Sequence, residues 1–137
     1  MNDQFSVRDK TVMITGGSSG LGLQMARLFM RSGAKVCSIA TQHDPRICEN
    51  LNASVRFYPP VFVAANLTGD EGVNAAFEAC DAAFGPLDIL INNAGMQFRA
   101  PLEDFPDDKW QQLLQTNISS VFYTGQAVAR HMIKRGR

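Results

Sequence analysis

Residues 12–22 read VMITGGSSGLG, and this stretch decides the fold. The apolar residues 12–14 predict a short buried strand. A helix is predicted over 21–32, where apolar side chains recur at helical spacing: Met25, Ala26, Leu28 and Phe29. Strand, glycine-rich turn and helix together present free backbone N–H groups and the positive end of a helix dipole. The stretch therefore predicts an anion site, and in this context a nucleotide-binding turn.

The glycines of this turn suit the close approach of a pyrophosphate. A Cβ at Gly20 would block the phosphates, which we expect to lie against the backbone of residues 18–21. Gly22 lets the helix pack tightly against the sheet. The alternative is a turn that is rich in glycine for conformational reasons only. The candidate cofactor-binding residues here are Gly16, Ser18, Ser19, Gly20, Leu21 and Gly22.

The spacing of the glycines separates this turn from two other phosphate loops. Three residues lie between Gly16 and Gly20, whereas the commonest dinucleotide fingerprint has one residue between its first two glycines. No Lys-Ser or Lys-Thr pair follows Gly22, as the loop of nucleoside triphosphatases requires. The pattern is instead Thr-Gly-x-x-x-Gly-x-Gly.

Three ordered motifs resemble the short-chain dehydrogenase/reductase family. They are the turn at 15–22, the sequence LINNAG at 90–95, and Asn117 within LQTNIS at 114–119. The resemblance covers essentially the whole chain, but only about the first half of a usual family member. It implies an oxidoreductase that transfers hydride between NAD(P) and a small-molecule alcohol or ketone.

Strand and helix signals alternate along the chain, which is typical of a parallel sheet covered by helices. Gly33 is predicted to end the first helix, and Asp44 is the candidate N-cap of the second, with Pro45 in its first turn. We expect one domain over 1–137, a Rossmann-type, doubly wound parallel α/β sheet that is incomplete, with strand order 3-2-1-4. The predicted strands cover 12–14, 35–40, 61–65 and 89–91, and the predicted helices cover 21–32, 44–52, 70–84 and 107–134.

Two asparagine motifs have roles implied by the resemblance. Asn93, Ala94 and Gly95 would line the cofactor cleft while the Asn92-Asn93 pair braces the sheet. Asn117 would be catalytic, because it shapes a helix bend and holds a water in the proton relay. The alternative for Asn92 and Asn93 is a pair at the end of a strand that only hydrogen-bonds the local backbone. The alternative for Asn117 is an exposed helix residue without a catalytic role.

Asn66 stands where the family usually places an aspartate that accepts a hydrogen bond from the adenine amino group. An asparagine can accept through its amide oxygen but brings no charge. We therefore expect Asn66 and Leu67 to bind adenine. The alternative is that Asn66 is only a turn residue at the end of the third strand.

The end of the second strand bears on the choice of coenzyme. A carboxylate there would bond the ribose 2′-OH of NAD and repel the 2′-phosphate of NADP. Residues 38–43 read SIATQH, with no acid before Asp44, so Thr41 is a candidate donor to a 2′-phosphate. His43 or Arg46 would add positive charge. We expect NADP as the coenzyme. NAD is the alternative, because Ser19 stands just before Gly20, where the resemblance would most commonly place a basic residue.

The stretch GMQFRAP at 95–101, with the Trp110 region, resembles the sugar-acid members of the family, the gluconate 5-dehydrogenase group. Arg99 is the candidate to pair with a substrate carboxylate in a bidentate fork, and an exposed loop arginine is the alternative. No metal-ligand clustering is present, so no metal is expected.

Composition excludes several other classes. The 137 residues are 45% hydrophobic, and thirteen basic and thirteen acidic side chains cancel, so neither nucleic acid nor an anionic membrane is an expected partner. No membrane span or secretion signal is visible.

Three cysteines, odd in number, indicate reduced packing thiols and a cytoplasmic protein: Cys37, Cys48 and Cys80. A basic cluster is interpreted as the solvated end of a helix: Arg130, His131, Lys134, Arg135 and Arg137.

The family's chemistry needs a serine and a Tyr-x-x-x-Lys pair beyond Asn117. Only Tyr58 and Tyr123 occur, and Phe62 and Ala127 stand four residues after them. We expect a chain truncated before its proton-transfer residues and inactive alone. The rivals are a non-catalytic nucleotide-binding or interaction module and a scaffold with a vestigial turn. The helix at 107–134 has surplus apolar surface, from which we expect a homo-oligomer with an isologous contact.

Overall fold

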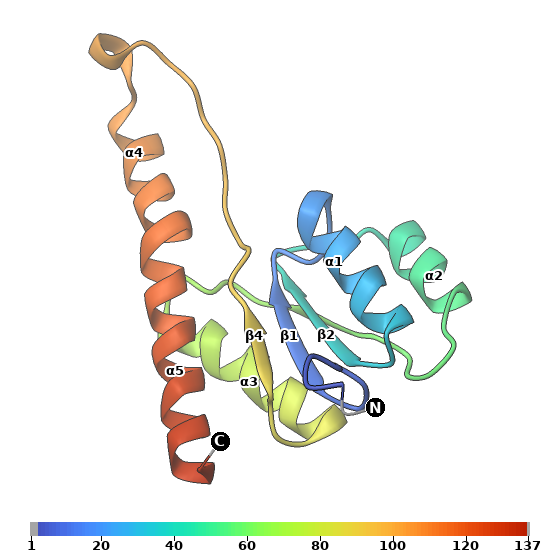
Figure 1. Cartoon of the computed structure of the whole chain (residues 1–137). Coiled ribbons are helices and arrows are strands. Elements are labelled where there is room, and N and C mark those ends of the chain that lie inside the picture. Colours follow the sequence, from blue (N-terminus) through green and yellow to red (C-terminus); the bar gives the residue numbers. More distant parts are fainter. Residues whose placement is uncertain (1–2, 137) are drawn as a thin grey trace.

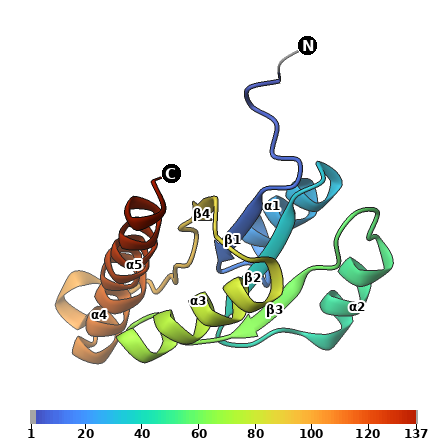
Figure 2. The same ribbon diagram turned by 90° about the horizontal axis from the view of Figure 1, so that it is seen from below.

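Four parallel strands form the centre of the molecule, whose computed structural model describes residues 3–136. The strands lie in the order β3-β2-β1-β4, and each neighbouring pair is parallel (Figure 1, with β3 labelled in Figure 2). This confirms the doubly wound α/β fold and its 3-2-1-4 order. The bounds are β1 Thr11–Thr15, β2 Lys35–Ala40, β3 Val61–Ala64 and β4 Ile89–Ile91.

Helices cover both faces of this sheet. Figure 2 shows α1 and α2 on one side, with α3 and the α4–α5 rod on the other. The helix bounds are α1 Gly20–Arg31, α2 Pro45–Ala53, α3 Asp70–Phe84, α4 Asp107–Leu114 and α5 Ser120–Arg135, with a 3-10 turn η1 at Leu102–Asp104 and a π-helical turn η2 at Gln115–Ser119.

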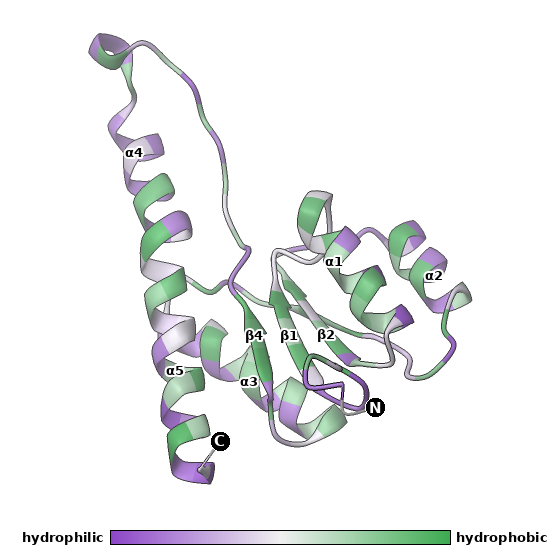
Figure 3. Ribbon diagram, in the orientation of Figure 1, coloured by the Kyte–Doolittle hydropathy of each residue, from purple (hydrophilic) through white to green (hydrophobic). Residues whose placement is uncertain are grey.

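The two hydrophobic cores follow from the alternation of side chains along β1. Val12 and Ile14 point to one face, where they pack with residues of α1 such as Ala26. Met13 points to the other face and packs in the core that includes Val128 of α5. Val12, Met13 and Ile14 are almost completely buried, which is why the middle of this strand is apolar. Figure 3 shows the same hydrophobic character in the neighbouring strands.

The predicted helix at 107–134 is confirmed in outline, but it is not one α-helix. α4 and α5 are joined through η2, the π-helical turn that contains Asn117. Before α4, the segment that follows β4 runs away from the sheet and returns through η1, which the sequence did not predict (Figure 1).

The ends of several elements have the predicted local chemistry. The Asp44 side chain accepts a hydrogen bond from Arg46 N–H at 2.9 Å, and Pro45 occupies the first turn of α2, so the predicted cap is confirmed. Gly33, directly after the Ser32 cap of α1, has a φ of +87°, which favours glycine. β3 ends at Ala64, one residue before the predicted end.

The basic cluster at the end of α5 is less solvated than predicted. Arg135 donates to the Leu87 carbonyl at 2.8 Å and pairs with Asp88 at 3.3 Å, with 19% of its side chain exposed. His131 packs edge-on against Phe77 at 4.7 Å between ring centroids. Arg137 lies outside the described residues.

The structure also bears on the predictions of free thiols and of no membrane-spanning segment. Cys37, Cys48 and Cys80 are free, as predicted, and Cys37 and Cys80 are buried together in the core. The hydrogen bond to Cys80 and burial raise the pKa of the Cys37 thiol above its ordinary range. Within residues 3–136, no helix has the length and apolar character needed to cross a membrane.

Candidate functional site

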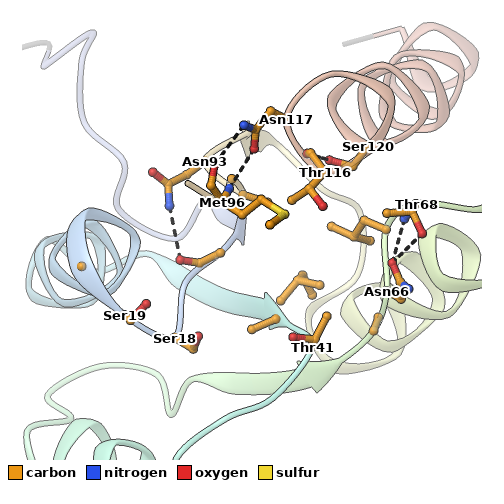
Figure 4. Close-up of a pocket in the computed structure, with 18 of the residues that line it drawn as sticks. Ser18, Ser19, Thr41, Asn66, Thr68, Asn93, Met96, Thr116, Asn117 and Ser120 are labelled. Atoms are coloured by element: carbon orange, nitrogen blue, oxygen red, sulfur yellow. Dashed lines mark hydrogen bonds between the residues drawn. The ribbon is translucent and has the colours of Figure 1, made fainter. Parts of the chain in front are cut away.

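A pocket opens at the carboxyl ends of the strands, where the chain order along the sheet reverses between β1 and β4. Open α/β sheets bind ligands at such a crevice. Figure 4 shows its two sides, with Ser18 and Ser19 across from Asn66 and Thr68. Its lining is Gly16, Ser18, Ser19, Gly20, Leu21, Ile39, Ala40, Thr41, Ala65, Asn66, Leu67, Thr68, Asn93, Ala94, Gly95, Met96, Gln97, Thr116, Asn117 and Ser120.

The glycine turn gives this pocket an exposed helix N-terminus. α1 begins at Gly20, and the side chain of its N-cap, Ser19, makes no capping hydrogen bond. The first N–H groups of the helix are therefore left for an anion. A Cβ built on Gly20 would meet no atom within 4 Å, although the φ of +54° is itself unfavourable for other residues. Gly20 is one of the residues that line the pocket.

Gly22 lies behind the turn and does not line the pocket. A Cβ on Gly22 would lie 2.1 Å from the Gly16 carbonyl oxygen and 2.5 Å from Asn93 Nδ2. The absence of a side chain thus lets α1 press against the start of the turn and against the segment after β4. This close packing is the role that the sequence predicted for Gly22.

The Thr15 hydroxyl joins the turn to the segment after β4. Its oxygen accepts hydrogen bonds from the N–H groups of Asn93 and Ala94, both at 3.0 Å, and donates to the Ile91 carbonyl at 3.4 Å. Asn93 Nδ2 adds a bond to the Gly16 carbonyl at 3.2 Å. The sequence motif contains Thr15, but only the fold shows its partners.

Asn117 clamps the segment after β4 against the helix. Its Oδ1 accepts from Met96 N–H at 2.8 Å, and its Nδ2 donates to the Met96 carbonyl at 3.0 Å. A π-helical turn is a common device at functional sites, and here it carries Asn117 to the pocket wall. The Ser120 hydroxyl donates to the Thr116 carbonyl in the same region. A water held by Asn117 stays a prediction.

Asn66 lies at the other end of the pocket with its amide oxygen already occupied. Oδ1 accepts from Thr68 N–H at 3.0 Å and from the Thr68 hydroxyl at 2.7 Å (Figure 4). We expected this oxygen to accept from the adenine amino group, but both of its lone pairs have partners within the chain. Leu67 also lines the pocket, with 8% of its surface exposed.

The region around the end of β2 contains Thr41 in the pocket lining, but neither of the cations that we considered. His43 Nε2 donates to the Val63 carbonyl at 3.1 Å, and its ring packs edge-on against Phe62. Arg46 pairs with Asp44 at 3.3 Å, and its backbone N–H and guanidinium lower the pKa of that carboxyl. Among the described residues, no charged side chain lines this pocket.

Arg99 is exposed in the segment before η1, and the structure does not bring it to this pocket. No group of three or more potential metal ligands occurs in the part of the chain that is described. Several lining residues were not predicted from the sequence: Ile39, Ala40, Ala65, Thr68, Met96, Gln97, Thr116 and Ser120. Those at strand ends or beside the predicted motifs were within reach of a sequence argument.

Comparison with known proteins gives a family match along nearly the whole chain. The model of the short chain dehydrogenase family matches residues 10–137. Gluconate 5-dehydrogenase of Gluconobacter oxydans is 40% identical over 98% of this chain and 53% of its own length. 5-Keto-D-gluconate 5-reductase of Escherichia coli K12 is 34% identical, with the same two coverages, 98% and 53%.

Solved structures give the same result. A short-chain type dehydrogenase/reductase from Mycobacterium marinum has a TM-score of 0.89 at 29% identity, over 98% of this chain and 54% of that chain. A 3-ketoacyl-(acyl-carrier-protein) reductase from Brucella melitensis, complexed with NADH, has a TM-score of 0.85 at 30% identity, over 96% and 53%.

The chain belongs to the short-chain dehydrogenase/reductase family. It spans about half the length of the curated relatives it matches.

The replacement Thr15→Val tests the joint between the two pocket walls. It keeps the shape of the side chain but leaves the N–H groups of Asn93 and Ala94 without their acceptor, so we expect a loss of about 2–4 kcal/mol in the free energy of unfolding. The control is Thr11→Val, a second buried threonine of β1 whose hydroxyl bonds no other described residue. Urea unfolding of both variants measures the difference, and equal losses would contradict the assigned role.

Proposed function

We propose that this chain is the NAD(P)-binding half of an oxidoreductase that moves hydride between a nicotinamide dinucleotide and an alcohol or ketone. The observation that carries the proposal is the uncapped N-terminus of α1, which opens through the Gly16–Gly20 turn at the carboxyl ends of the strands. Backbone N–H groups there bind an anion without help from a cation. A similar solved structure is complexed with NADH, which supports the dinucleotide.

Different parts of the pocket would contact different parts of the dinucleotide. The backbone at 18–21 holds the phosphates, and the ribose and base extend toward Thr41 and Asn66. In the other direction, the Asn93–Gly95 backbone and the Asn117 clamp form the wall beside the nicotinamide position. The bound dinucleotide supplies the hydride chemistry. The chain orients the nicotinamide ring of the dinucleotide, and this orientation is most effective when both walls of the pocket are held fixed.

The pocket has no side chain that can give or take a proton near neutral pH. Within residues 3–136, its lining contains no Asp, Glu, His, Lys, Tyr or Cys. Hydride transfer to a ketone needs a proton in step, and Asn117 orients groups but does not titrate. We therefore propose that these 137 residues bind the dinucleotide without turnover, and that the Ser and Tyr-x-x-x-Lys of the family complete the site. The same observation favours a non-catalytic nucleotide-binding module as the second candidate.

A sugar acid is the substrate class we propose for the complete site. Two relatives are a gluconate 5-dehydrogenase and a 5-keto-D-gluconate 5-reductase. Arg99 is the proposed partner of the carboxylate. Because its segment runs away from the sheet, binding requires this segment to fold toward the pocket. The free thiols fit the reducing conditions of the cytoplasm, where we place the protein.

The glycine turn is tested by Gly20→Val. A branched side chain would fill the space beside the turn, so we expect NADP affinity in calorimetry to fall about tenfold or more, while the parent binds without oxidising gluconate. Gly136→Val is the control, since Gly136 also has a positive φ and open surroundings but lies at the end of α5. Unchanged affinity in the Gly20 variant would remove the turn from the site.

We propose NADP as the preferred coenzyme, because the lining has the Thr41 hydroxyl and no carboxylate at the end of β2. Thr41→Asp places a negative charge there, so we expect NADP affinity to fall about tenfold or more while NAD affinity holds or rises. Gln42→Asp, which adds the same charge outside the lining, is the control. A parent protein that binds NAD much more tightly than NADP would contradict the preference.

We also propose a homo-oligomer through the 107–134 helix. Trp110, Ile118, Phe122 and Ile133 keep 53–79% of their surface exposed along α4, η2 and α5, and Figure 3 shows the hydrophobic bands. A second copy of the same helix would cover them in an isologous contact. Sedimentation velocity should show a dimer or larger species that Phe122→Glu dissociates. A monomer at high concentration would contradict this proposal.

A further inference from the structure

A second hollow lies where α1 and α2 end, at the amino ends of the strands that follow them (Figure 1). It is lined by Arg31, the last residue of α1, and by residues 53–56, where α2 ends and the chain turns toward β3. Its volume of about 510 Å³ is in the range of small-molecule sites. The twelve residues of α1 span about 18 Å, so this hollow is separate from the glycine turn at the other end of the helix.

Arginine side chains without acceptors flank this hollow. Arg31 and Arg56 are exposed, and neither guanidinium forms a hydrogen bond or an ion pair with another described residue. Arg27 lies one turn before Arg31 on α1, and its buried Nε has no partner in the same part of the chain. Like charges at this helical spacing repel each other. Within residues 3–136, the lining contains no acidic side chain that would offset these charges.

The ends of α1 and α2 do not supply acceptors for these arginines. A basic side chain near the end of a helix often bonds the last carbonyls. In α1, the carbonyls of residues 28–30 instead accept from the backbone N–H groups of residues 32–34. In α2, the carbonyls of residues 51–52 accept from the N–H groups of residues 54–55. The guanidinium groups are therefore left for an acceptor from outside the described chain.

The residues that follow Arg56 bring one further cation and one acid to this end of the molecule. The Arg8 guanidinium lies over the Phe57 ring, 5.4 Å from its centroid. The Tyr58 hydroxyl donates to Asp9 Oδ1 at 2.6 Å, so this oxygen of the carboxylate is already engaged. Because the charges of Arg8 and Asp9 cancel, the surroundings leave the hollow positive.

We propose that this hollow binds a phosphate monoester, with the phosphate between Arg31 and Arg56 and the organic group against Ala53 and Val55. Each guanidinium presents a planar fork that matches two phosphate oxygens, and a dianion satisfies two forks at once. A carboxylate has one charge and two oxygens, so it would leave one fork unmatched. Val55 packs against the hydrophobic core and gives the hollow an apolar side for the organic group.

The test is a titration of the ¹⁵N-labelled protein with phenyl phosphate at low ionic strength, followed by nuclear magnetic resonance. The method shows where the ligand binds as well as how tightly. We expect the amide signals of residues 53–56 to shift, and phenyl phosphate to bind about threefold or more tightly than inorganic phosphate, because its ring covers apolar surface. A phosphate on the glycine turn would instead shift the signals of residues 16–22, so the two sites are distinguished.

Two variants each remove one fork from the hollow. In Arg31→Gln and in Arg56→Gln we expect the affinity for phenyl phosphate at residues 53–56 to fall about tenfold. Both side chains are exposed, so the variants should keep the fold. Arg130→Gln is the matched control, because Arg130 is an exposed arginine of α5 outside the hollow and its replacement removes the same charge. We expect its affinity to stay within about twofold of the parent.

Several results would overturn the inference. Phenyl phosphate that leaves the signals of residues 53–56 in place shows that the hollow is not its site. Unchanged affinity in the Arg56 variant removes the fork from recognition. An equal loss in Arg130→Gln means that general charge, and not this hollow, attracts the anion. Inorganic phosphate that binds as tightly as phenyl phosphate contradicts a monoester as the ligand. Each of these results leaves the dinucleotide pocket untouched, because that site lies at the other end of α1.

Discussion

The hydrogen bonds of the Thr15 hydroxyl hold together two parts of the chain that lie almost eighty positions apart. β1 is paired with β2 on one side and β4 on the other, so the turn after β1 and the segment after β4 begin next to each other. The Thr15 oxygen takes the N–H groups of Asn93 and Ala94, and Asn93 returns a bond to Gly16. The glycine turn, α1 and the segment after β4 are thereby held together. Each buried N–H left without an acceptor would cost about 1–3 kcal/mol.

The described lining of this pocket is electrically neutral. The described lining residues carry no formal charge, so in the proposed complex the charge of the dinucleotide would be met by backbone dipoles and hydroxyl groups. His43 and Arg46, which have the right sequence positions to add charge, are engaged with Val63 and Asp44. Recognition then depends on the exact direction of donors and acceptors.

Much of the fold could be predicted because its signals are local. Short apolar runs marked the strands, and Asp44-Pro45 marked the start of α2 with its cap. The glycine motif likewise located the turn. The partners of Thr15, Asn117 and Arg135 could not be predicted, because Asn93, Met96 and Asp88 meet them only after the sheet and helices have packed. The occupied oxygen of Asn66 depends on Thr68, two residues away, but rotamer choice rather than sequence decides it.

The π-helical turn at Gln115–Ser119 fits an extra residue into the long helix without breaking it. An α-helix advances about 100° per residue, so removing one residue here would restore regular winding and rotate one half of the rod against the other. Thr124 and Val128, which are now buried, would turn away from the interior, or Asn117 would leave Met96. The rod therefore accepts changes of side chain far more readily than changes of length, and a single deletion would uncouple its packing from its contact with the pocket.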